Sequence, residues 1–201
     1  MTPFLFPATI TLLLFFHPLP TISTFVLDTD GEPLRNGGSY NVVPKGFHGG
    51  LTLTQKSDNN SPCPLYITRK TACPGIPVKI SSPLKVLYIP LSVDVNIVFT
   101  NNATTCMEPL GWRVTPDVTT GQFYVATGGT STVVTDFFTI EEADENGRSE
   151  KYAYKLRYCP SFEGGDEKKC GDVNFFREGF VGITNEEPLF VQFKKANANL
   201  D

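Results

Sequence analysis

The chain has 201 residues with 17 basic and 21 acidic side chains, and its net charge of −4 argues against nucleic acid or an anionic membrane as a partner. Its 17 Gly, 16 Pro and 16 Phe are scattered, and no long stretch has the i, i+3, i+4 apolar spacing of a helix. The length and composition therefore exclude a helical bundle and predict one domain large enough for a hydrophobic core.

The first 23 residues predict a signal peptide. They contain no charged side chain and are apolar from Phe4 to Phe16, but the run is too short and too interrupted by Pro to span a bilayer. Thr21-Ile22-Ser23 has the small-x-small pattern that suits signal peptidase. We expect residues 1–23 to be removed and residues 24–201 to form the mature domain; a buried N-terminal strand is the alternative. No later segment is long and apolar enough for a membrane span, so a product without a membrane partner, extracellular or vacuolar, is expected.

Short β-rich runs separated by Gly, Pro or Asn turns follow along the chain. Regularly interrupted short strands predict an all-β sandwich or barrel. Asn146-Gly147, in a polar stretch ahead of Tyr152, predicts a hairpin turn. The expected strands are Leu51 to Thr54, Leu65 to Thr68, Val86 to Ile89, Val93 to Thr100, Phe123 to Ala126, Phe137 to Ile140, Tyr152 to Tyr158 and Leu189 to Phe193.

The segment from Val26 to Val42 carries the most specific pattern. An aliphatic residue and Asp28 stand two positions apart, a turn follows at Asp30-Gly31, and five residues separate Leu34 from Tyr40. By itself this pattern predicts only a hairpin. The motifs that add specificity are C-P-L at Cys63, C-x5-W from Cys106 to Trp112, C-P at Cys159, C-G-D at Cys170 and P-L-F-V-Q-F from Pro188 to Phe193.

With these motifs the chain resembles the plant Kunitz family of the soybean trypsin inhibitor type over nearly its whole length after residue 23. The resemblance implies a β-trefoil, with three pseudo-repeats of four strands that form a six-stranded barrel and a hairpin cap. Trp112 is expected in the core of this fold. The family also implies a protein without a cofactor, and we expect a monomer.

Five Cys in a chain with a leader fit an oxidising compartment. The sequence alone allows many pairings, whereas the resemblance implies disulfides Cys63 to Cys106 and Cys159 to Cys170. Cys73 is then left over. We expect a buried or partly shielded thiol there, and a bridge to another chain or a different internal pairing are the alternatives.

The segment Ser82-Pro83-Leu84-Lys85-Val86-Leu87 resembles the inhibitory loop of the family's trypsin inhibitors. In that resemblance Lys85 is P1 and Val86 is P1′, so the peptide bond between them is the reactive bond. Trypsin-like serine proteases have an Asp at the base of the S1 pocket, which favours a Lys or Arg side chain. Pro83 fixes its own φ and biases Ser82 towards an extended conformation. A solvated loop Lys without inhibitory role is the alternative for Lys85.

Inhibition without digestion requires a loop that is held still. In the family an Asn of the N-terminal N-G-G segment hydrogen-bonds the carbonyl groups of the loop, and Asn36-Gly37-Gly38 stands at the matching position here. The Asn amide both donates and accepts hydrogen bonds, as this role needs. A simple turn at Asn36-Gly37 is compatible with the same role.

Other functions remain as alternatives on the same fold. The family includes non-inhibitory storage, taste-modifying and pigment-binding proteins, and inhibitors of amylases or of other protease classes. An enzyme is not expected, because His48 is the only His after leader removal and no G-x-S-x-G motif occurs. A metal site is not expected because there is no C-x-x-C. Asn102 begins a glycosylation sequon, as Asn59 does, and the resemblance implies a role in plant defence or in control of an endogenous protease.

Overall fold

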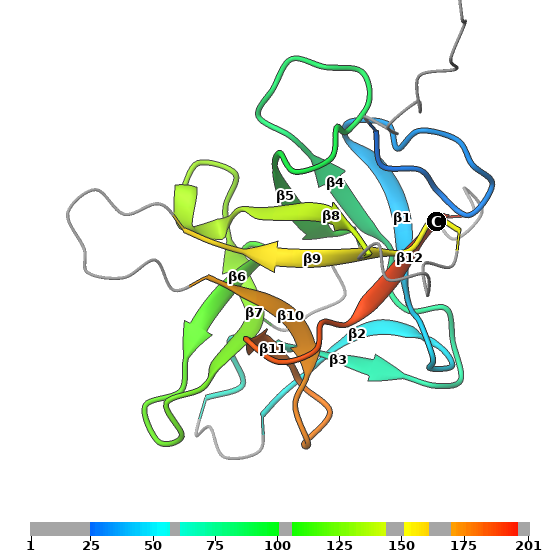
Figure 1. The fold of residues 1–201 in the computed structure, drawn as a ribbon. Coiled ribbons are helices and arrows are strands. Elements are labelled where there is room, and N and C mark those ends of the chain that lie inside the picture. Colours follow the sequence, from blue (N-terminus) through cyan, green and yellow to red (C-terminus); the bar gives the residue numbers. More distant parts are fainter. Residues whose placement is uncertain (1–24, 57–60, 101–105, 144–150, 161–169, 197–201) are drawn as a thin grey trace, which may run out of the picture.

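The computed structural model describes residues 25–56, 61–100, 106–143, 151–160 and 170–196, which form an all-β fold (Figure 1). The expected leader, the sequons at Asn59 and Asn102, and the turn at Asn146-Gly147 lie outside these ranges. The elements are β1 (Gly38–Pro44), β2 (Gly50–Thr54), β3 (Tyr66–Lys70), β4 (Val78–Ser81), β5 (Asp94–Phe99), β6 (Gly111–Pro116), β7 (Phe123–Gly129), the 3-10 helix η1 (Val134–Asp136), β8 (Phe138–Glu142), β9 (Tyr154–Tyr158), β10 (Gly171–Phe175), β11 (Val181–Thr184) and β12 (Phe190–Lys195).

Six strands close into a barrel. β1 pairs with β4 and β12, β5 pairs with β4 and β8, and β9 pairs with β8 and β12, all antiparallel. Because every strand of this ring has a neighbour on each side, the ring leaves no unpaired sheet edge. The barrel expected from the sequence is therefore present, and the sandwich is excluded.

The other six strands form three hairpins on one side of the barrel. β2 pairs with β3, β6 with β7 and β10 with β11. The hairpins also touch one another, since β7 pairs with both β3 and β11. In Figure 1 they lie below the barrel, whereas the connection from β4 to β5 rises above it. The two sides of the molecule thus have different structures.

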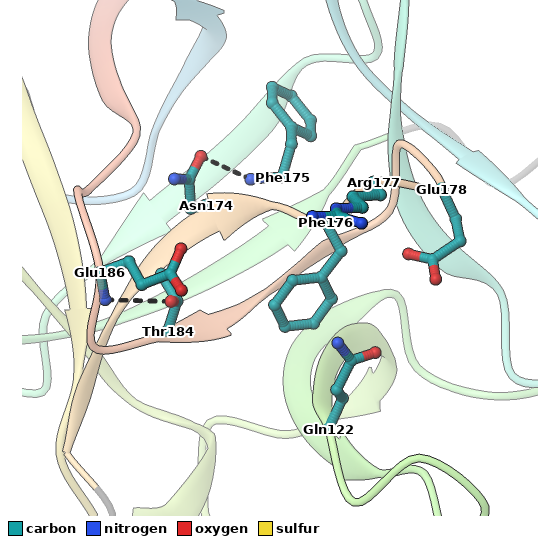
Figure 2. Close-up of a pocket in the computed structure, with 8 residues that line it drawn as sticks. All are labelled: Gln122, Asn174, Phe175, Phe176, Arg177, Glu178, Thr184 and Glu186. Carbon is teal, nitrogen blue, oxygen red and sulfur yellow. Dashed lines mark hydrogen bonds between the residues drawn. The ribbon is translucent and has the colours of Figure 1, made fainter.

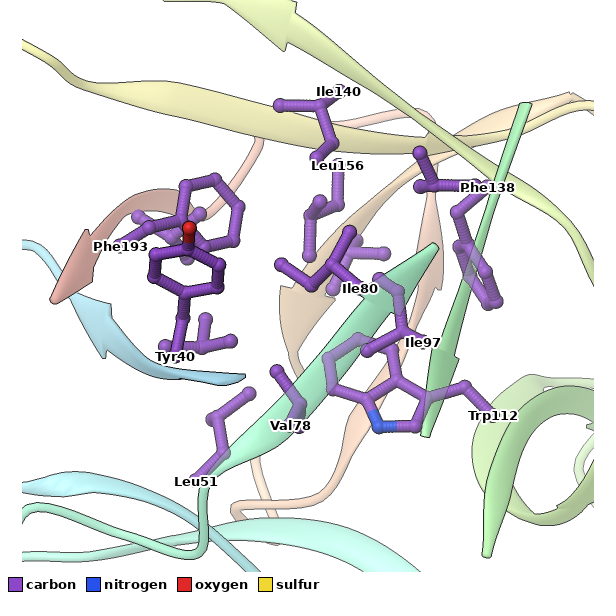
Figure 3. Packing of buried hydrophobic residues seen from close by; sticks show 14 of the residues in the cluster. Tyr40, Leu51, Val78, Ile80, Ile97, Trp112, Phe138, Ile140, Leu156 and Phe193 are labelled. Carbon is purple, nitrogen blue, oxygen red and sulfur yellow. The ribbon is translucent and has the colours of Figure 1, made fainter. Parts of the chain in front are cut away.

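The core fills the interior of the barrel and its junction with the hairpins (Figure 3). Side chains alternate between buried and partly exposed along β9, as expected for a strand with one face on the core. Trp112 is fully buried, and its ring centroid lies 5.9 Å from that of Phe99 and 5.8 Å from that of Phe138. Full burial of one large apolar side chain stabilises a fold by about 1.5–3 kcal/mol. The core position expected for Trp112 is confirmed.

A second cluster lies among the hairpins. Tyr66, Tyr124 and Ala126 are buried there, with Phe176 and Phe180 packed against them. The Lys56 ammonium lies 4.5 Å from the Tyr124 ring centroid and forms an ion pair with the Asp117 carboxylate. This ion pair joins the segment after β2 to the turn between β6 and β7.

Two disulfides tie the chain together. One joins Cys63 to Cys106 and the other joins Cys159 to Cys170, the pairs that the family resemblance implied. Cys73 forms no disulfide and is partly buried, between β3 and β4. The long bridge joins the segment before β3 to the segment before β6, and the short one joins the end of β9 to the start of β10.

One expected strand is wrong. Residues 86–89 are not a strand: Val86 and Leu87 are exposed in a loop, Ile89 is buried, and only Tyr88 makes a single bridge, to Arg35. The other seven expected strands overlap β2, β3, β5, β7, β8, β9 and β12. The strands β4, β6, β10 and β11 were not expected, and β1 lies mostly in the segment for which a hairpin was expected. β4 and β11 have only four residues each, and β6, β10 and β11 contain Gly, which is depleted in strands.

Candidate functional site

The candidate site is the loop that follows β4. Residues 83–87 are all exposed, whereas Ser82 before them and Ile89 after them are buried. Leu87 is 65% exposed and Leu84 is 47% exposed, which is unusual for side chains of this type. The loop stands at the top of Figure 1, beside the blue N-terminal segment. An apolar, exposed loop between two buried anchors is suited to contact with another protein.

Local hydrogen bonds shape the apex of the loop. The Val86 N–H donates to the Leu84 carbonyl at 2.9 Å, which closes a three-residue turn centred on Lys85. The Leu84 N–H lies 3.3 Å from the Ser82 hydroxyl oxygen, which accepts its hydrogen bond. Lys85 is exposed and forms no ion pair within the described part of the chain. Its ammonium group is thus available to a binding partner.

Both arms of the loop are fixed to the body of the protein. The first arm leaves β4, which is paired on both sides, with β1 and β5. On the second arm the Ile89 N–H donates to the Leu34 carbonyl at 2.9 Å, and the Val26 N–H donates to the Ile89 carbonyl at 3.0 Å. The chain between the arms has no strand partner of its own. Contacts with the neighbouring turn hold it instead.

Asn36 lies against this central part of the loop. Its Nδ2 is 3.1 Å from the Leu84 carbonyl oxygen and 3.1 Å from the Val86 carbonyl oxygen. The same nitrogen is 3.4 Å from the Ser82 carbonyl oxygen, and the Asn36 Oδ1 accepts the Ser82 N–H at 2.9 Å. One amide group therefore bonds the chain on both sides of Lys85. An amide is the one small side chain that offers two donor hydrogens and an acceptor together.

The turn that carries Asn36 is itself well fixed. The Asn36 backbone N–H donates to the Leu87 carbonyl at 2.9 Å, and the Gly37 N–H donates to the Ile80 carbonyl at 2.7 Å. Gly37 has φ +78°, a conformation that favours glycine. The Tyr40 hydroxyl, from a ring that is 3% exposed, accepts the Arg35 N–H at 2.8 Å. Tyr40 was part of the sequence pattern, but its contact with this turn was not foreseen.

The remaining candidate residues lie away from the loop or take no part in it. His48 is exposed in the connection between β1 and β2, and its carbonyl oxygen accepts a hydrogen bond from Arg69. Among the described residues no group of three or more His, Cys, Asp or Glu side chains could hold a metal ion. The described residues also contain no helix long and apolar enough to cross a membrane.

A pocket of about 360 Å³ lies beside the β10–β11 hairpin (Figure 2). This hairpin and the loop lie on opposite sides of the barrel (Figure 1). Its polar groups are partly satisfied locally. The Phe175 N–H donates to the Asn174 side chain, and the Glu186 N–H donates to the Thr184 hydroxyl oxygen. The pocket shares no residue with the loop. The lining residues are Gln122, Asn174, Phe175, Phe176, Arg177, Glu178, Thr184 and Glu186.

Comparison with known proteins identifies the family. The legume Kunitz family model, described as trypsin and protease inhibitor, matches residues 26–195. The chain belongs to this Kunitz family. It is 34% identical to Kunitz trypsin inhibitor 4 of Arabidopsis thaliana over 187 residues, which cover 86% of this chain and 82% of that protein. It is also 34% identical to trypsin inhibitor BvTI of Bauhinia variegata, over 86% of this chain and 96% of that one.

Solved structures agree with the family and show its breadth. Soybean trypsin inhibitor in complex with porcine pancreatic trypsin matches with a TM-score of 0.67 and 27% identity, covering 86% of this Kunitz chain and 99% of that one. A water-soluble chlorophyll protein of Brassica oleracea, with chlorophyll b, matches with a TM-score of 0.69 and 25% identity over the same shares. This fold therefore serves more than one function, so the function of this chain has to be argued from its loop.

Proposed function

We propose that this protein inhibits trypsin-like serine proteases by substrate-like binding of the loop, with Lys85 as P1 and Val86 as P1′. The observation that carries the proposal is the single amide of Asn36, which bonds carbonyl groups on both sides of Lys85. The exposed Lys85 side chain is long and cationic, as an S1 pocket with an Asp at its base requires. Leu84 and Val86 are exposed beside it and would occupy S2 and S1′.

The hydrogen bonds explain why such binding would inhibit rather than lead to digestion. A loop that is already ordered loses little conformational entropy on entering the protease cleft, so more of the contact energy remains as affinity. If the bond between Lys85 and Val86 is cut, Asn36 still holds Leu84 on one side and Val86 on the other. The new amine then stays close to the acyl group, which favours reformation of the bond over escape of the ends.

We further infer that the architecture is a β-trefoil. Each consecutive set of four strands gives two strands to the barrel and one hairpin to the cap: β1 to β4, β5 to β8, and β9 to β12. This threefold plan supports the fold expected from the resemblance. The family model begins at residue 26, which agrees with a leader over residues 1–23. We propose that residues 24–201 form a monomeric, secreted domain. Glycosylation at Asn102 and a role in plant defence are part of the same proposal.

Titration of trypsin with the oxidised chain 24–201 tests the proposed function. We expect stoichiometric inhibition by the parent and a loss of about 100-fold or more for Lys85→Ala, as for truncation of a central anchor residue. Lys70→Ala is the matched control, because Lys70 is an exposed Lys at the end of β3. A folded parent that does not inhibit trypsin would contradict the proposal. Inhibition of chymotrypsin or subtilisin instead would indicate another target protease, and inhibition of none of the three would favour a non-inhibitory binding or storage role.

A further inference from the structure

Asn36 is followed by Gly37, and an Asn-Gly dipeptide is prone to deamidation of the Asn side chain. In an Asn-Gly sequence the backbone nitrogen of the Gly can attack the side-chain carbonyl carbon of the Asn, because Gly has no Cβ to hinder the approach. Ammonia leaves and a cyclic succinimide forms. Addition of a solvent water then opens the ring to aspartate or isoaspartate. The net change is loss of ammonia and gain of water, with no oxidation or reduction.

Replacement of Gly37 by another residue, which would slow deamidation, is disfavoured by the conformation of the turn. Gly37 has φ +78°, in the left-handed region, where most side chains are strained. The first residue must be an amide, since its two donor hydrogens and its acceptor are all engaged by the loop. The Asn-Gly pair is therefore built into the support of the loop.

Conversion of Asn36 would reverse the interactions that hold the loop. A carboxylate at this position has acceptors only, so it can donate no hydrogen bond to the carbonyl groups of Leu84 and Val86. It would place a negative charge about 3 Å from the same oxygens, where Nδ2 now lies at 3.1 Å from each. The Ser82 N–H would keep an acceptor. The apex of the loop would lose its support while its first arm stayed bound.

The docked loop protects the same residue from the reaction. The attacking nitrogen of Gly37 must lose its proton, but its N–H donates to the Ile80 carbonyl at 2.7 Å. The Asn36 side chain must also turn towards that nitrogen, which would break its contacts with Ser82, Leu84 and Val86. Reaction thus requires local opening of the turn and the loop together.

We propose that Asn36 is a deamidation site that inactivates the loop, and that docking of the loop preserves the amide. The inactivation rests on the proposed inhibitory function, whereas the protection does not. An intact inhibitor would then be long-lived, and one whose loop has been released would lose its clamp irreversibly. The rate of deamidation at Asn36 would thus depend on whether the loop is docked.

The experiment ages the oxidised protein in mildly alkaline buffer and follows both Asn-Gly sites by peptide mass spectrometry. Asn146-Gly147 is the second such dipeptide in the chain and controls for buffer and temperature. We expect Asn36 to convert about tenfold or more slowly in the folded than in the reduced, denatured chain, because opening must precede reaction. Equal rates for Asn36 in the two states would overturn the protection.

The aged protein is then separated by ion exchange, and each fraction titrates trypsin. Fractions converted at position 36 should inhibit about tenfold or more weakly, as loss of hydrogen bonds to a held loop implies. The Asn36→Asp variant should behave alike, and chain converted only at Asn146 should inhibit as the parent does. Full inhibition by chain converted at position 36 would overturn the inactivation.

The readouts separate this inference from the proposed function. If the unaged parent does not inhibit trypsin, the proposed function fails. Loop release is then judged by limited digestion with a protease of broad specificity. Faster cutting of residues 83–87 in Asn36→Asp than in the parent would support release of the loop on conversion of Asn36, and equal cutting would overturn it.

Discussion

Asn36 and Ser82, 46 positions apart in the sequence, bind each other through both ends of the Asn36 amide. The Ser82 N–H donates to the Asn36 Oδ1 at 2.9 Å, and the Asn36 Nδ2 lies 3.4 Å from the Ser82 carbonyl oxygen. Ser82 is buried, so this contact fixes the point at which the chain leaves β4 and becomes exposed. The loop that follows is therefore positioned from its first residue.

Tyr40→Phe should weaken inhibition without removing a contact to the loop. The substitution keeps the buried ring but removes the hydroxyl that accepts the Arg35 N–H at 2.8 Å. We expect the free energy of unfolding to fall by about 1 kcal/mol and the inhibition constant for trypsin to rise, because the turn that carries Asn36 loses support. Denaturant melts and tight-binding titration measure the two effects.

Tyr154→Phe is the matched control for this experiment. The Tyr154 hydroxyl accepts the Leu27 N–H at the same distance of 2.8 Å, and Leu27 lies outside the turn at Asn36. A similar loss of stability with a smaller effect on inhibition is expected. An equal rise of the inhibition constant in both variants would show that general stability, and not the turn, controls the loop.

Substitution of Lys85 should redirect the inhibitor rather than only weaken it. Lys85→Arg keeps the positive charge that a trypsin-like S1 pocket attracts, so trypsin inhibition should persist. Lys85→Phe should no longer inhibit trypsin and should inhibit chymotrypsin, whose S1 pocket is hydrophobic. Parallel titration of both proteases measures the change. Undiminished trypsin inhibition by Lys85→Phe would place the P1 residue elsewhere.

The two disulfides should contribute unequally to stability. The bridge from Cys63 to Cys106 spans 43 positions and that from Cys159 to Cys170 spans 11. Chain entropy predicts losses in the free energy of unfolding of about 4 and 3 kcal/mol for the paired Ser variants. Cys73→Ser is the control, since Cys73 forms no disulfide, and should change stability by less than about 1 kcal/mol. Denaturant melts that rank the short bridge above the long one would contradict the entropic account.

The free energy of unfolding should depend on acidic pH differently in Asp117→Asn and in the parent. A hydrogen bond from Lys56, aided by the N–H groups of the β6–β7 turn, lowers the pKa of Asp117 from 3.8 to about 2. The folded state therefore gains stability above pH 3.8 and loses it as the pH falls towards 2. The variant keeps an acceptor for the Thr119 N–H but lacks the charge, so its stability should lack this acid-dependent part.

Unfolding curves at several acidic pH values check this expectation. Asp94→Asn serves as the control, because Asp94 is exposed at the start of β5. The difference between the parent and Asp117→Asn should shrink as the pH falls below 3.8. A difference that stays constant between neutral pH and pH 2 would mean that the ion pair with Lys56 contributes nothing to folding.

The sequence predicted most of the strands because their signals are local. β9 alternates buried and partly exposed side chains, and β5 has a continuous buried run, so each can be recognised from its own residues. The segment from Val86 to Ile89 has the same β-branched and aliphatic composition but is not a strand. Whether such a segment pairs depends on which backbone lies beside it. Here the neighbours are the backbone of residues 34–36, which makes single hydrogen bonds and one isolated bridge but no strand, and the side-chain amide of Asn36.

The sequence by itself determined the family, the all-β class and the two residues, Lys85 and Asn36, on which the proposed function depends. These follow from residue types at fixed spacings along the chain. Only the tertiary structure decided which six strands close the barrel, that the Tyr40 hydroxyl supports the turn before it, and that the Asn36 amide bonds the loop on both sides of Lys85. Such relationships join backbone groups that are far apart in the sequence, and hydrogen bonds of 3 Å exist only once the folded core has fixed both partners.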